Sequence, residues 1–250
     1  MTEIKKLEIE PVVNPFKGMT QKEIQERENY INSVLKNEER IKCQKRFEAC
    51  GIGVEHKDYR MDNFVVTNKT QENMKRNAKK FYVNVHDKKV ISNLVLLGNA
   101  GQGKTRLAIS LLHIFSELVK NSNYGLNDYY TVSYTTSKDI CNTLQQYTGF
   151  NASTKYNNVL KEYAYADIMA IDEIGKATNK HEYELIFDLL DKRLAMGKST
   201  ILISNQSYDD FTNSVGEYAM SRINPDGNMI LIDTSDLPDY RQNKDLLKVV

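Results

Sequence analysis

Eight consecutive residues of the sequence have the types and spacing needed to bind phosphate. Residues 98 to 105, GNAGQGKT, fit the pattern G-x-x-x-x-G-K-[ST] without a mismatch. Glycines let backbone N–H groups turn toward an anion without a Cβ clash. Lys104 would contact the β- and γ-phosphates, and the Thr105 hydroxyl would bind Mg²⁺. The pattern therefore predicts binding of a nucleoside triphosphate together with Mg²⁺.

The residues around this loop favour a binding site over an ordinary glycine turn. Residues 91 to 97 form an apolar run, and residues 106 to 119 carry apolar side chains at helical spacing. A phosphate loop needs both neighbours, because it joins a buried strand to a helix whose N-terminus faces the anion. The candidate nucleotide-binding residues are Gly98, Asn99, Ala100, Gly101, Gln102, Gly103, Lys104, Thr105 and Arg106.

A second set of candidate residues lies in and after the apolar run of ADIMAIDEIG, residues 166 to 175. A buried parallel strand that ends in two carboxylates delivers them to the edge of a sheet, where ligands bind. Asp172 would hold Mg²⁺ directly or through water, and Glu173 would polarise the attacking water. Asn205, after the predicted strand of residues 200 to 204, could orient that water, although Asn is also a common turn residue. Together these residues predict hydrolysis of the bound nucleotide.

Strand-like and helix-like segments alternate from residue 91 onward. The predicted strands cover residues 91–97, 129–134, 166–175, 200–204 and 229–232, and the predicted helices cover 106–119, 137–147, 159–163, 181–196 and 211–223. Residues 121 to 128 are predicted to form a polar turn, and residues 148 to 156 a polar segment between helices. This alternation predicts an α/β fold with a mainly parallel sheet.

The first 90 residues have a different character. Thr20 and Glu23 form a capping box, and the stretch to residue 49 predicts one long helix or two short ones ending near Gly51. Its discontinuous apolar stripe could lie on the remainder of the chain, but we favour docking onto a partner protein. Tyr59 and Phe64 are expected to anchor residues 51 to 68, and a polar helix over residues 70 to 82 should lie near the nucleotide base. We divide the chain into a helical extension (1–50), a linker (51–90) and a nucleotide-binding domain (91–250).

Composition and charge limit the class of protein. The 250 residues are 40% hydrophobic and 27% charged, and no run reaches the ~18 apolar residues of a membrane span. The N-terminus has no signal-peptide core, so we expect a cytoplasmic protein without membrane contact. Residues 1 to 90 hold 19 Lys and Arg against 14 Asp and Glu, so a polyanion or an acidic partner would bind there, although such charges more often form a solvated face. Three cysteines suit a reducing compartment; Cys43, Cys50 and His56 could suggest zinc, but free thiols are preferred because no fourth ligand is evident.

The motifs together resemble the DnaC-type bacterial helicase loaders, a branch of the AAA+ ATPases that also includes the IstB transposition helpers. The resemblance runs from about Phe47 to Arg241 and rests on GNAGQGKT, ADIMAIDEIG, ILISNQS, GEYAMSRI and the closing DYR. It implies a P-loop AAA+ fold, a three-layer sandwich with a mainly parallel central sheet, no separate helical lid and a small helical N-terminal extension.

The resemblance also assigns roles to single residues. Asn205 resembles sensor 1, and Arg222 resembles the arginine finger, which in this family completes the ATP site of a neighbouring subunit. Hydrolysis would then require a homo-oligomer, a ring or spiral formed with ATP. Arg241 is similar to the C-terminal sensor 2 arginine. Tyr218 stands where these loaders often carry another arginine.

Residues 138 to 156 coincide with the helical insertion that lines the central channel of initiator and loader AAA+ proteins. Tyr147 and Phe150 could stack on the bases of single-stranded DNA, and Lys138 or Lys155 could contact its phosphates. Aromatic residues in a polar connector can instead be local packing anchors, so both interpretations stay open.

The resemblance thus implies a Mg²⁺-dependent ATPase that holds single-stranded DNA and loads the hexameric replicative helicase. Residues 1 to 50 would contact the helicase. Two alternatives remain: an IstB-like transposition helper that acts on duplex DNA, and a factor that sequesters the helicase and uses ATP only as a conformational ligand.

Overall fold

The computed structural model describes residues 20–123, 126–147, 153–175 and 180–242, and the chain divides after Lys42 into two compact units. The first described helix, α1 (Gln21–Glu48), is a single helix, which decides between the two predicted arrangements. Its predicted capping box is present: Thr20 N donates to Glu23 Oε2 at 2.8 Å and Glu23 N to Thr20 Oγ1 at 3.3 Å. The end of α1 belongs to the second unit, where Phe47 is buried.

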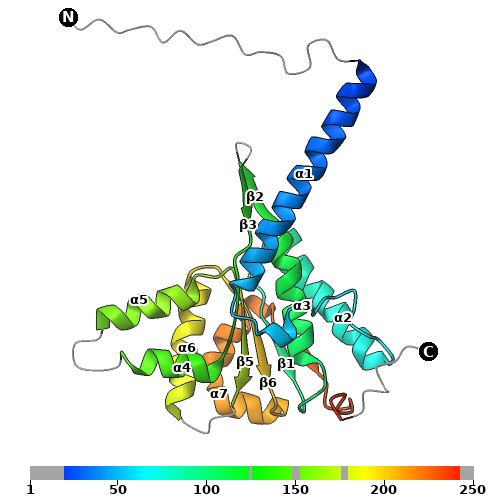
Figure 1. Cartoon of the computed structure of the whole chain (residues 1–250). Coiled ribbons are helices and arrows are strands. Elements are labelled where there is room, and N and C mark those ends of the chain that lie inside the picture. The colour runs from blue at the N-terminus through cyan, green and yellow to red at the C-terminus, as the bar shows by residue number, and fades with distance from the viewer. Residues whose placement is uncertain (1–19, 124–125, 148–152, 176–179, 243–250) are drawn as a thin grey trace, which may run out of the picture. The chain divides into compact units, whose positions relative to one another are not determined.

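The second unit is built on a five-stranded, wholly parallel sheet (Figure 1). Its order is β4 (Val132–Thr136), β5 (Ile168–Ile174), β6 (Ser199–Ser204), β1 (Leu94–Leu97) and β7 (Ile230–Asp233). All five strands were predicted, within a few residues at their ends. Because the strands are parallel, their carboxyl ends meet at one edge, where the candidate site must form.

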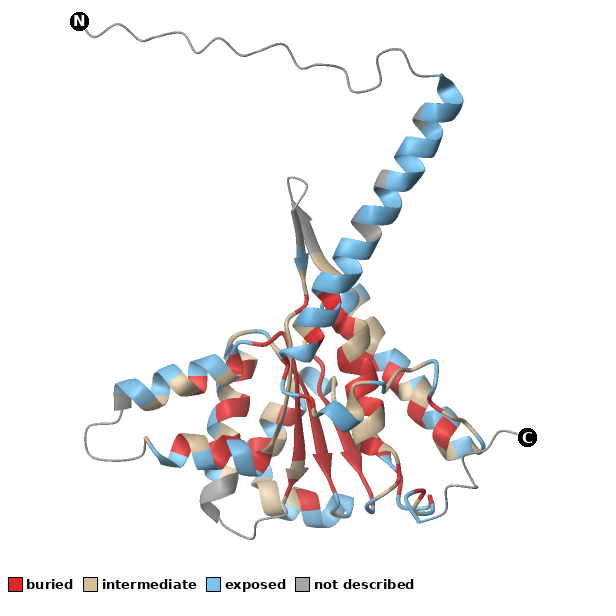
Figure 2. Cartoon of the chain, in the orientation of Figure 1, coloured by how far each residue is buried: buried red, intermediate tan, exposed pale blue. Residues whose placement is uncertain are grey.

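Helices cover both faces of this sheet. One face packs against α2 (Lys69–Tyr82) and α3 (Lys104–Glu117), and the other against α4 (Ser137–Gln145), α5 (Ser153–Ala164), α6 (Lys180–Ala195) and α7 (Tyr208–Ile223). Alternate residues of β1 supply the two cores: Leu94 and Leu96 face the first layer, Val95 and Leu97 the second. Figure 2 shows the strands buried between these layers. The predicted three-layer α/β sandwich is therefore confirmed.

Residues 121 to 128 differ from the prediction of a polar turn. Residues 121–123 and 126–128 belong to two antiparallel strands, β2 (Val119–Asn123) and β3 (Leu126–Tyr129), in which Val119 pairs with Tyr129. The prediction was wrong because a two-stranded ribbon can be held by backbone hydrogen bonds without the apolar alternation of a buried strand. Short helical turns complete the described elements, at Val54–His56, Val83–Asp87 and Pro225–Gly227. No helix among the described residues is long and apolar enough to span a bilayer.

The segment after α1 is fixed along the edge strand β4. The Cys50 carbonyl accepts a hydrogen bond from Tyr134 N at 2.7 Å. Gly51 has a φ of 93°, and a Cβ there would lie 2.4 Å from the Tyr134 carbonyl oxygen. Only glycine fits this approach. The cysteines lie inside the fold, and in the described part of the chain no group of three or more His, Cys, Asp or Glu side chains is arranged to hold a metal ion.

A partly buried histidine makes this docking sensitive to acid. The Phe47 ring meets the His113 ring edge-on at a centroid distance of 4.6 Å, and burial lowers the pKa of His113 to about 4, with Arg60 adding to the effect. The unfolded chain therefore binds this proton more readily, so stability is lost as the pH falls from about 6.5 toward 4. We expect the free energy of unfolding to drop by about 2 kcal/mol by pH 5, since one pKa unit corresponds to about 1.4 kcal/mol.

Urea unfolding at pH 7 and pH 5 measures this loss. His113→Gln should be less sensitive than the wild type over this interval, because glutamine does not titrate. Equal pH dependence in the two proteins would remove His113 as the cause.

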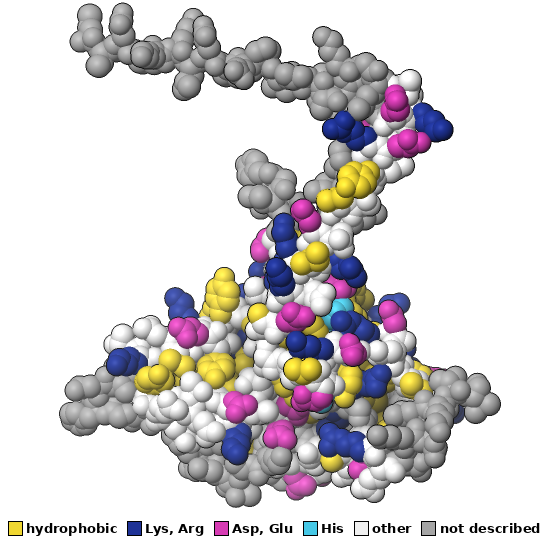
Figure 3. Space-filling model, viewed as in Figure 1, with side chains coloured by type: hydrophobic (Ala, Val, Ile, Leu, Met, Phe, Trp, Pro, Cys, Tyr) yellow, Lys and Arg dark blue, Asp and Glu magenta, His cyan; other side chains and the backbone are white. Residues whose placement is uncertain are grey.

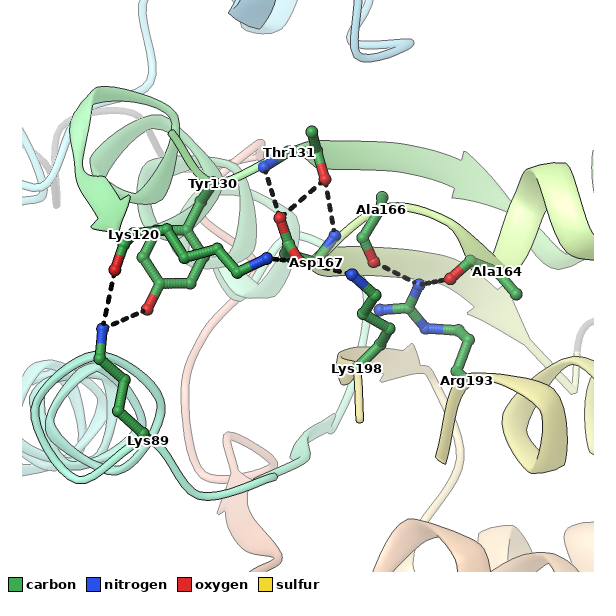
Figure 4. Close-up of polar contacts among 9 residues, drawn as sticks. All are labelled: Lys89, Lys120, Tyr130, Thr131, Ala164, Ala166, Asp167, Arg193 and Lys198. Atoms are coloured by element: carbon green, nitrogen blue, oxygen red, sulfur yellow. Dashed lines mark hydrogen bonds and ion pairs between the residues drawn. The ribbon is translucent and has the colours of Figure 1, made fainter. Parts of the chain in front are cut away.

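A buried polar cluster fixes the amino ends of the central strands (Figure 4). The Asp167 carboxylate accepts hydrogen bonds from Lys120 Nζ at 2.9 Å, Lys198 Nζ at 2.6 Å and Thr131 N at 3.0 Å. Burial alone would raise the pKa of Asp167, but these hydrogen bonds outweigh it and hold the pKa at about 2. The Arg193 guanidinium lies beside them, fully buried. This cluster is at the opposite edge of the sheet from the phosphate loop, and we assign it to stability.

Candidate active site

The glycines of the phosphate loop have the backbone geometry that the motif requires. The loop connects β1 to α3, and Gly98, Gly101 and Gly103 have φ values of 123°, 76° and 87°. These positive angles are costly for residues with a Cβ. Gly103 caps the N-terminus of α3, whose unpaired N–H groups and positive dipole end favour an anion. The local sequence therefore produces a phosphate cradle.

Lys104 is held inside this loop. Its side chain is buried, and its Nζ donates to the Gly98 carbonyl at 2.7 Å and the Asn99 carbonyl at 2.6 Å. Burial lowers the pKa of Lys104 to about 8, opposed by Asp172 and assisted by Arg241. A buried ammonium with an incomplete countercharge is suited to a polyanionic ligand, which would restore the charge balance.

Asp172 and Thr105 meet at the carboxyl edge of the sheet. Thr105 Oγ1 donates to Asp172 Oδ2 at 2.8 Å, and Glu173 N donates to Asp172 Oδ1 at 2.7 Å. A hydroxyl and a carboxylate next to a phosphate cradle are the oxygen ligands that Mg²⁺ prefers, so these residues fit the ion. The structure thus brings together the two predicted metal ligands.

Tyr134 is a member of this site that the sequence did not reveal. Its hydroxyl donates to Asp172 Oδ2 at 2.9 Å from the neighbouring strand β4. Burial, followed by the charge of Asp172, raises the pKa of Tyr134, so the phenol stays protonated and acts as a donor. Only its position in the sequence could have indicated Tyr134: it is a polar group near the carboxyl end of a strand predicted to be parallel to β5.

Glu173 sits in an unusual backbone conformation. Its φ is 61°, and the pairing of β5 with β6 contains one extra residue between Ile171 and Ile174. This bulge takes Glu173 out of the regular alternation of the strand. Ser137 Oγ donates to the Glu173 carbonyl at 3.0 Å and Ser204 Oγ to the Ile174 carbonyl at 2.7 Å, which fixes the bulge. A non-glycine residue in the left-handed region is a form of strain that clusters at functional sites.

Asn205 lies beside the phosphate loop. It is exposed immediately after β6 and lines an open polar depression together with Asn99 of the loop. The other lining residues are Gln206, Ser207, Asp210, Asn213 and Ser214.

Arg106, a predicted nucleotide-binding residue, contacts the linker in this structure. Its Nη2 donates to the Asn63 carbonyl at 2.7 Å, and its guanidinium lies 5.0 Å from the Tyr59 ring centroid. Arg106 therefore ties the linker to α3. Phe64, also in the linker, packs in the core next to the loop: a Cβ on Gly103 would lie 3.8 Å from its ring.

A buried glutamine connects the loop to the segment that carries Arg241. Gln102 is 3% exposed; its Nε2 donates to the Leu237 carbonyl at 2.5 Å, and its Oε1 accepts from Thr234 Oγ1 at 2.9 Å. Tyr240 N donates to the Gly101 carbonyl at 3.1 Å. Arg241 follows, exposed but near enough to influence the Lys104 ammonium.

Gln102→Leu should therefore destabilise the protein. The substitution keeps the volume but leaves the Leu237 carbonyl and the Thr234 hydroxyl with fewer partners, at a cost of about 1–3 kcal/mol. The free energy of unfolding in urea measures this cost, with the exposed Asn213→Leu as control. A Gln102→Leu protein as stable as the wild type would show that these contacts are not needed.

Arg222 lies far from the loop of its own chain. Its carbonyl accepts from Asn93 Nδ2 at 3.2 Å, and Asn93 precedes β1 whereas the loop follows it. Gly98, the first residue of the loop, is five positions after Asn93 along extended chain, a rise of about 16 Å. The Arg222 Nε donates to Asp191 Oδ1 at 2.5 Å. The structure thus brings Lys104, Thr105 and Asp172 together, with Glu173 and Asn205 on the same edge, but places Arg222 apart.

The nucleic-acid candidates lie on the helical hairpin of α4 and α5, which projects from the sheet in Figure 1. Tyr147, half-buried, follows α4, and the exposed Lys155 is in the first turn of α5. Lys138 is exposed at the other end of α4, about 14 Å away along the helix axis. Phe150 is outside the described residues. Figure 3 shows basic and acidic side chains interspersed over the visible face. A DNA strand bound on that face would therefore contact individual cations and not a broad basic surface.

Comparison with known proteins decides the family. The model of a family described as IstB-like ATP binding protein matches residues 2–224. The chain belongs to this family. It is 28% identical over 194 residues to the replicative helicase loader DnaC of Escherichia coli strain K12, covering 77% of this chain and 74% of that protein.

Solved structures show the same fold. A crystal structure of the DnaC helicase loader superposes with a TM-score of 0.58 at 21% identity, covering 73% of this chain and 100% of that one. The replication initiator DnaA bound to AMPPCP and single-stranded DNA gives a TM-score of 0.55 at 18% identity, over 76% of this chain and 54% of the initiator. This IstB-like protein therefore has the P-loop AAA+ fold that its motifs predicted.

Proposed function

We propose that this protein is an ATP-dependent loader of the replicative DNA helicase. The observation that carries the proposal is the joined group of Lys104 in the phosphate loop with Thr105 and Asp172, in a chain that is similar to a replicative helicase loader. Such a group supports Mg²⁺-ATP binding, and Glu173 supports hydrolysis.

The residues divide the work of hydrolysis. The loop N–H groups and Lys104 would bind and orient the phosphates, while Thr105 and Asp172 would hold Mg²⁺. Bound Mg²⁺ supplies positive charge against the charge that develops on the phosphate oxygens. Glu173 accepts a proton from the attacking water, and the Asn205 amide orients that water. Tyr134 fixes Asp172 by its hydrogen bond.

The distance between Arg222 and its own loop supports a site shared by two subunits. A guanidinium at the far edge of the sheet cannot reach the phosphates of its own chain, so any role in hydrolysis must be in a neighbouring subunit. We therefore propose a homo-oligomer, in ring or spiral form, when ATP is bound.

The DNA and helicase contacts are assigned to separate parts of the chain. The α4–α5 hairpin carries Tyr147 and Lys155 at one end, an aromatic and a cation of the kind that holds single strands. The similarity of fold to an initiator bound to single-stranded DNA is consistent with this placement. We assign helicase docking to the N-terminal extension, which has its own compact unit up to Lys42.

A loading assay tests the proposal. The purified chain is mixed with the replicative helicase of its source cell and closed circular single-stranded DNA, and the helicase that remains on the DNA after a salt wash is measured. With ATP, the chain should increase the retained helicase at least several-fold. Equal retention without the chain would overturn the proposal.

One truncated variant locates the docking element. Removal of residues 1–42 should abolish co-purification with the helicase; the cut is placed before Cys43 because Phe47 and Cys50 are core residues. Retained binding would exclude the extension as the docking element.

A second candidate function follows from the family description. An IstB-like transposition helper would act on duplex DNA, so at a fixed salt concentration it should bind duplex more tightly than single strands. A loader should show the reverse preference.

A further inference from the structure

We infer that Asp191 is a positioning residue for Arg222: it holds the guanidinium ready at the subunit surface for the nucleotide of a neighbouring subunit. The inference rests on the proposed function, in which Arg222 acts on another subunit. It adds a residue of α6, whose carboxylate no sequence motif marks.

The backbone that carries Arg222 is rigidly mounted. Asn93, 3% exposed, donates through Nδ2 to the Arg222 carbonyl at 3.2 Å and the Ile223 carbonyl at 2.9 Å. Its Oδ1 accepts from Thr200 N at 2.8 Å, which joins the end of α7 to the start of β6. Ile223 is itself fully buried. The Cα of Arg222 is thus fixed to the central sheet, so only the Arg222 side chain can lose conformational freedom on assembly.

Two residues of α6, one turn apart, hold that side chain. Asp191 Oδ1 accepts from Arg222 Nε at 2.5 Å, and the Arg222 guanidinium carbon lies 5.9 Å from the Phe187 ring centroid. Both contacts come from the same helix, so together they select one direction for the guanidinium along α6.

The hydrogen bond to Asp191 uses Arg222 Nε, a nitrogen that is not needed when an arginine contacts a phosphate end-on. An arginine can bind two oxygens of a phosphate with its terminal nitrogens Nη1 and Nη2. Asp191 takes Nε, and among the described residues Nη1 makes only a longer contact of 3.2 Å, with Ser221 Oγ, a neighbour on the same helix. The geometry therefore orients the guanidinium and leaves its terminal edge for a ligand.

The ion pair is also weak enough to give way. The Arg222 and Asp191 side chains are 36% and 50% exposed, and exposed ion pairs contribute little because water and salt screen them. A triphosphate with several negative charges outcompetes such a partner. Asp191 would thus reduce the rotamer freedom lost on assembly without trapping the arginine. If it trapped the arginine instead, its removal would speed hydrolysis.

Mixed oligomers test this assignment. The acceptor is Arg222→Ala, which keeps a complete hydrolytic site but offers no arginine. The donor is Glu173→Gln, which offers Arg222 but cannot hydrolyse. Neither should turn over ATP alone, whereas the mixture should, because donor arginines complete acceptor sites. If the mixture is inactive, Arg222 does not act between subunits, and the proposed function of Arg222 and the role of Asp191 both fail.

A substitution at Asp191 is then added to either the donor chain or the acceptor chain of the mixture. Asp191→Asn in the donor should lower the kcat of the mixture about three- to tenfold with an unchanged KM for ATP, and Asp191→Glu in the donor should recover part of the loss. Asp191→Asn in the acceptor should have no effect, since that chain has no arginine to position. Asp188→Asn in the donor, one turn earlier on α6 and bonded to Tyr156, is the matched control.

Three results would overturn the role of Asp191 while leaving the action of Arg222 between subunits intact. In the first, an active mixture with Asp191→Asn in the donor has the same kcat as the Asp188→Asn control. In the second, its kcat is higher than that of the control. In the third, Asp191→Asn changes kcat equally in the donor and in the acceptor. Melting temperatures of all variants confirm that the half-exposed Asp191 site tolerates the changes.

Discussion

Glu173→Gln is expected to lower the kcat for ATP hydrolysis by about 10²–10⁴-fold, the range that a general base contributes. The amide keeps the size of the side chain but cannot accept the proton of the attacking water. Because Lys104, Thr105 and Asp172 are unchanged, the dissociation constant for ATP should stay within a few-fold of the wild type. Phosphate release and fluorescent-nucleotide titration measure the two quantities.

Glu162→Gln makes the same chemical change on the exposed face of α5 and should leave both quantities unaltered. Turnover by Glu173→Gln at the wild-type rate would remove Glu173 from the mechanism. ATP binding by the wild type without measurable turnover would favour a protein that uses ATP only as a conformational ligand.

Arg193→Leu should have the largest effect on stability. Arg193 is fully buried; its Nη1 donates to the Ala166 carbonyl at 2.8 Å (Figure 4), its Nε to Thr200 Oγ1 at 2.9 Å and its Nη2 to the Ser199 carbonyl. Leucine would leave these groups unpaired at the start of β5 and β6. We expect a loss of about 3–5 kcal/mol in the free energy of unfolding.

Urea unfolding provides the measurement, and Arg76→Leu on the exposed face of α2 is the control, with an expected change within about 0.5 kcal/mol. A loss below about 1 kcal/mol in Arg193→Leu would mean that water replaces the guanidinium. In that case the cluster around Asp167 would not be a main source of stability.

The sequence predicted those parts of the site that local spacing determines. Gly98 to Thr105 adopt their loop because glycines permit positive φ and a helix follows, both of which are written in adjacent residues. Asp172 could be placed because a buried apolar strand must end at the edge shared with the loop. The sheet and its two helical layers followed from the same alternation.

Other members of the site depend on neighbours that are distant in the sequence. Tyr134 reaches Asp172 from an adjacent strand, and Gln102 reaches Thr234 across more than a hundred residues. Asp191 pairs with Arg222 because α6 and α7 pack together. No periodicity or motif marks such contacts, since each depends on the register of packed elements. The β2–β3 strand pair was missed because its residues lack the apolar alternation used to recognise strands.

We propose that the phosphate loop is half of a hydrolytic site and that a second subunit supplies the rest. The most direct test is the ATP turnover per subunit, measured over a range of protein concentrations that spans assembly, with sedimentation to follow the oligomer. We predict that turnover per subunit rises steeply with assembly and falls toward zero on dilution to monomers. Constant turnover per subunit, with monomers as active as oligomers, would contradict the claim.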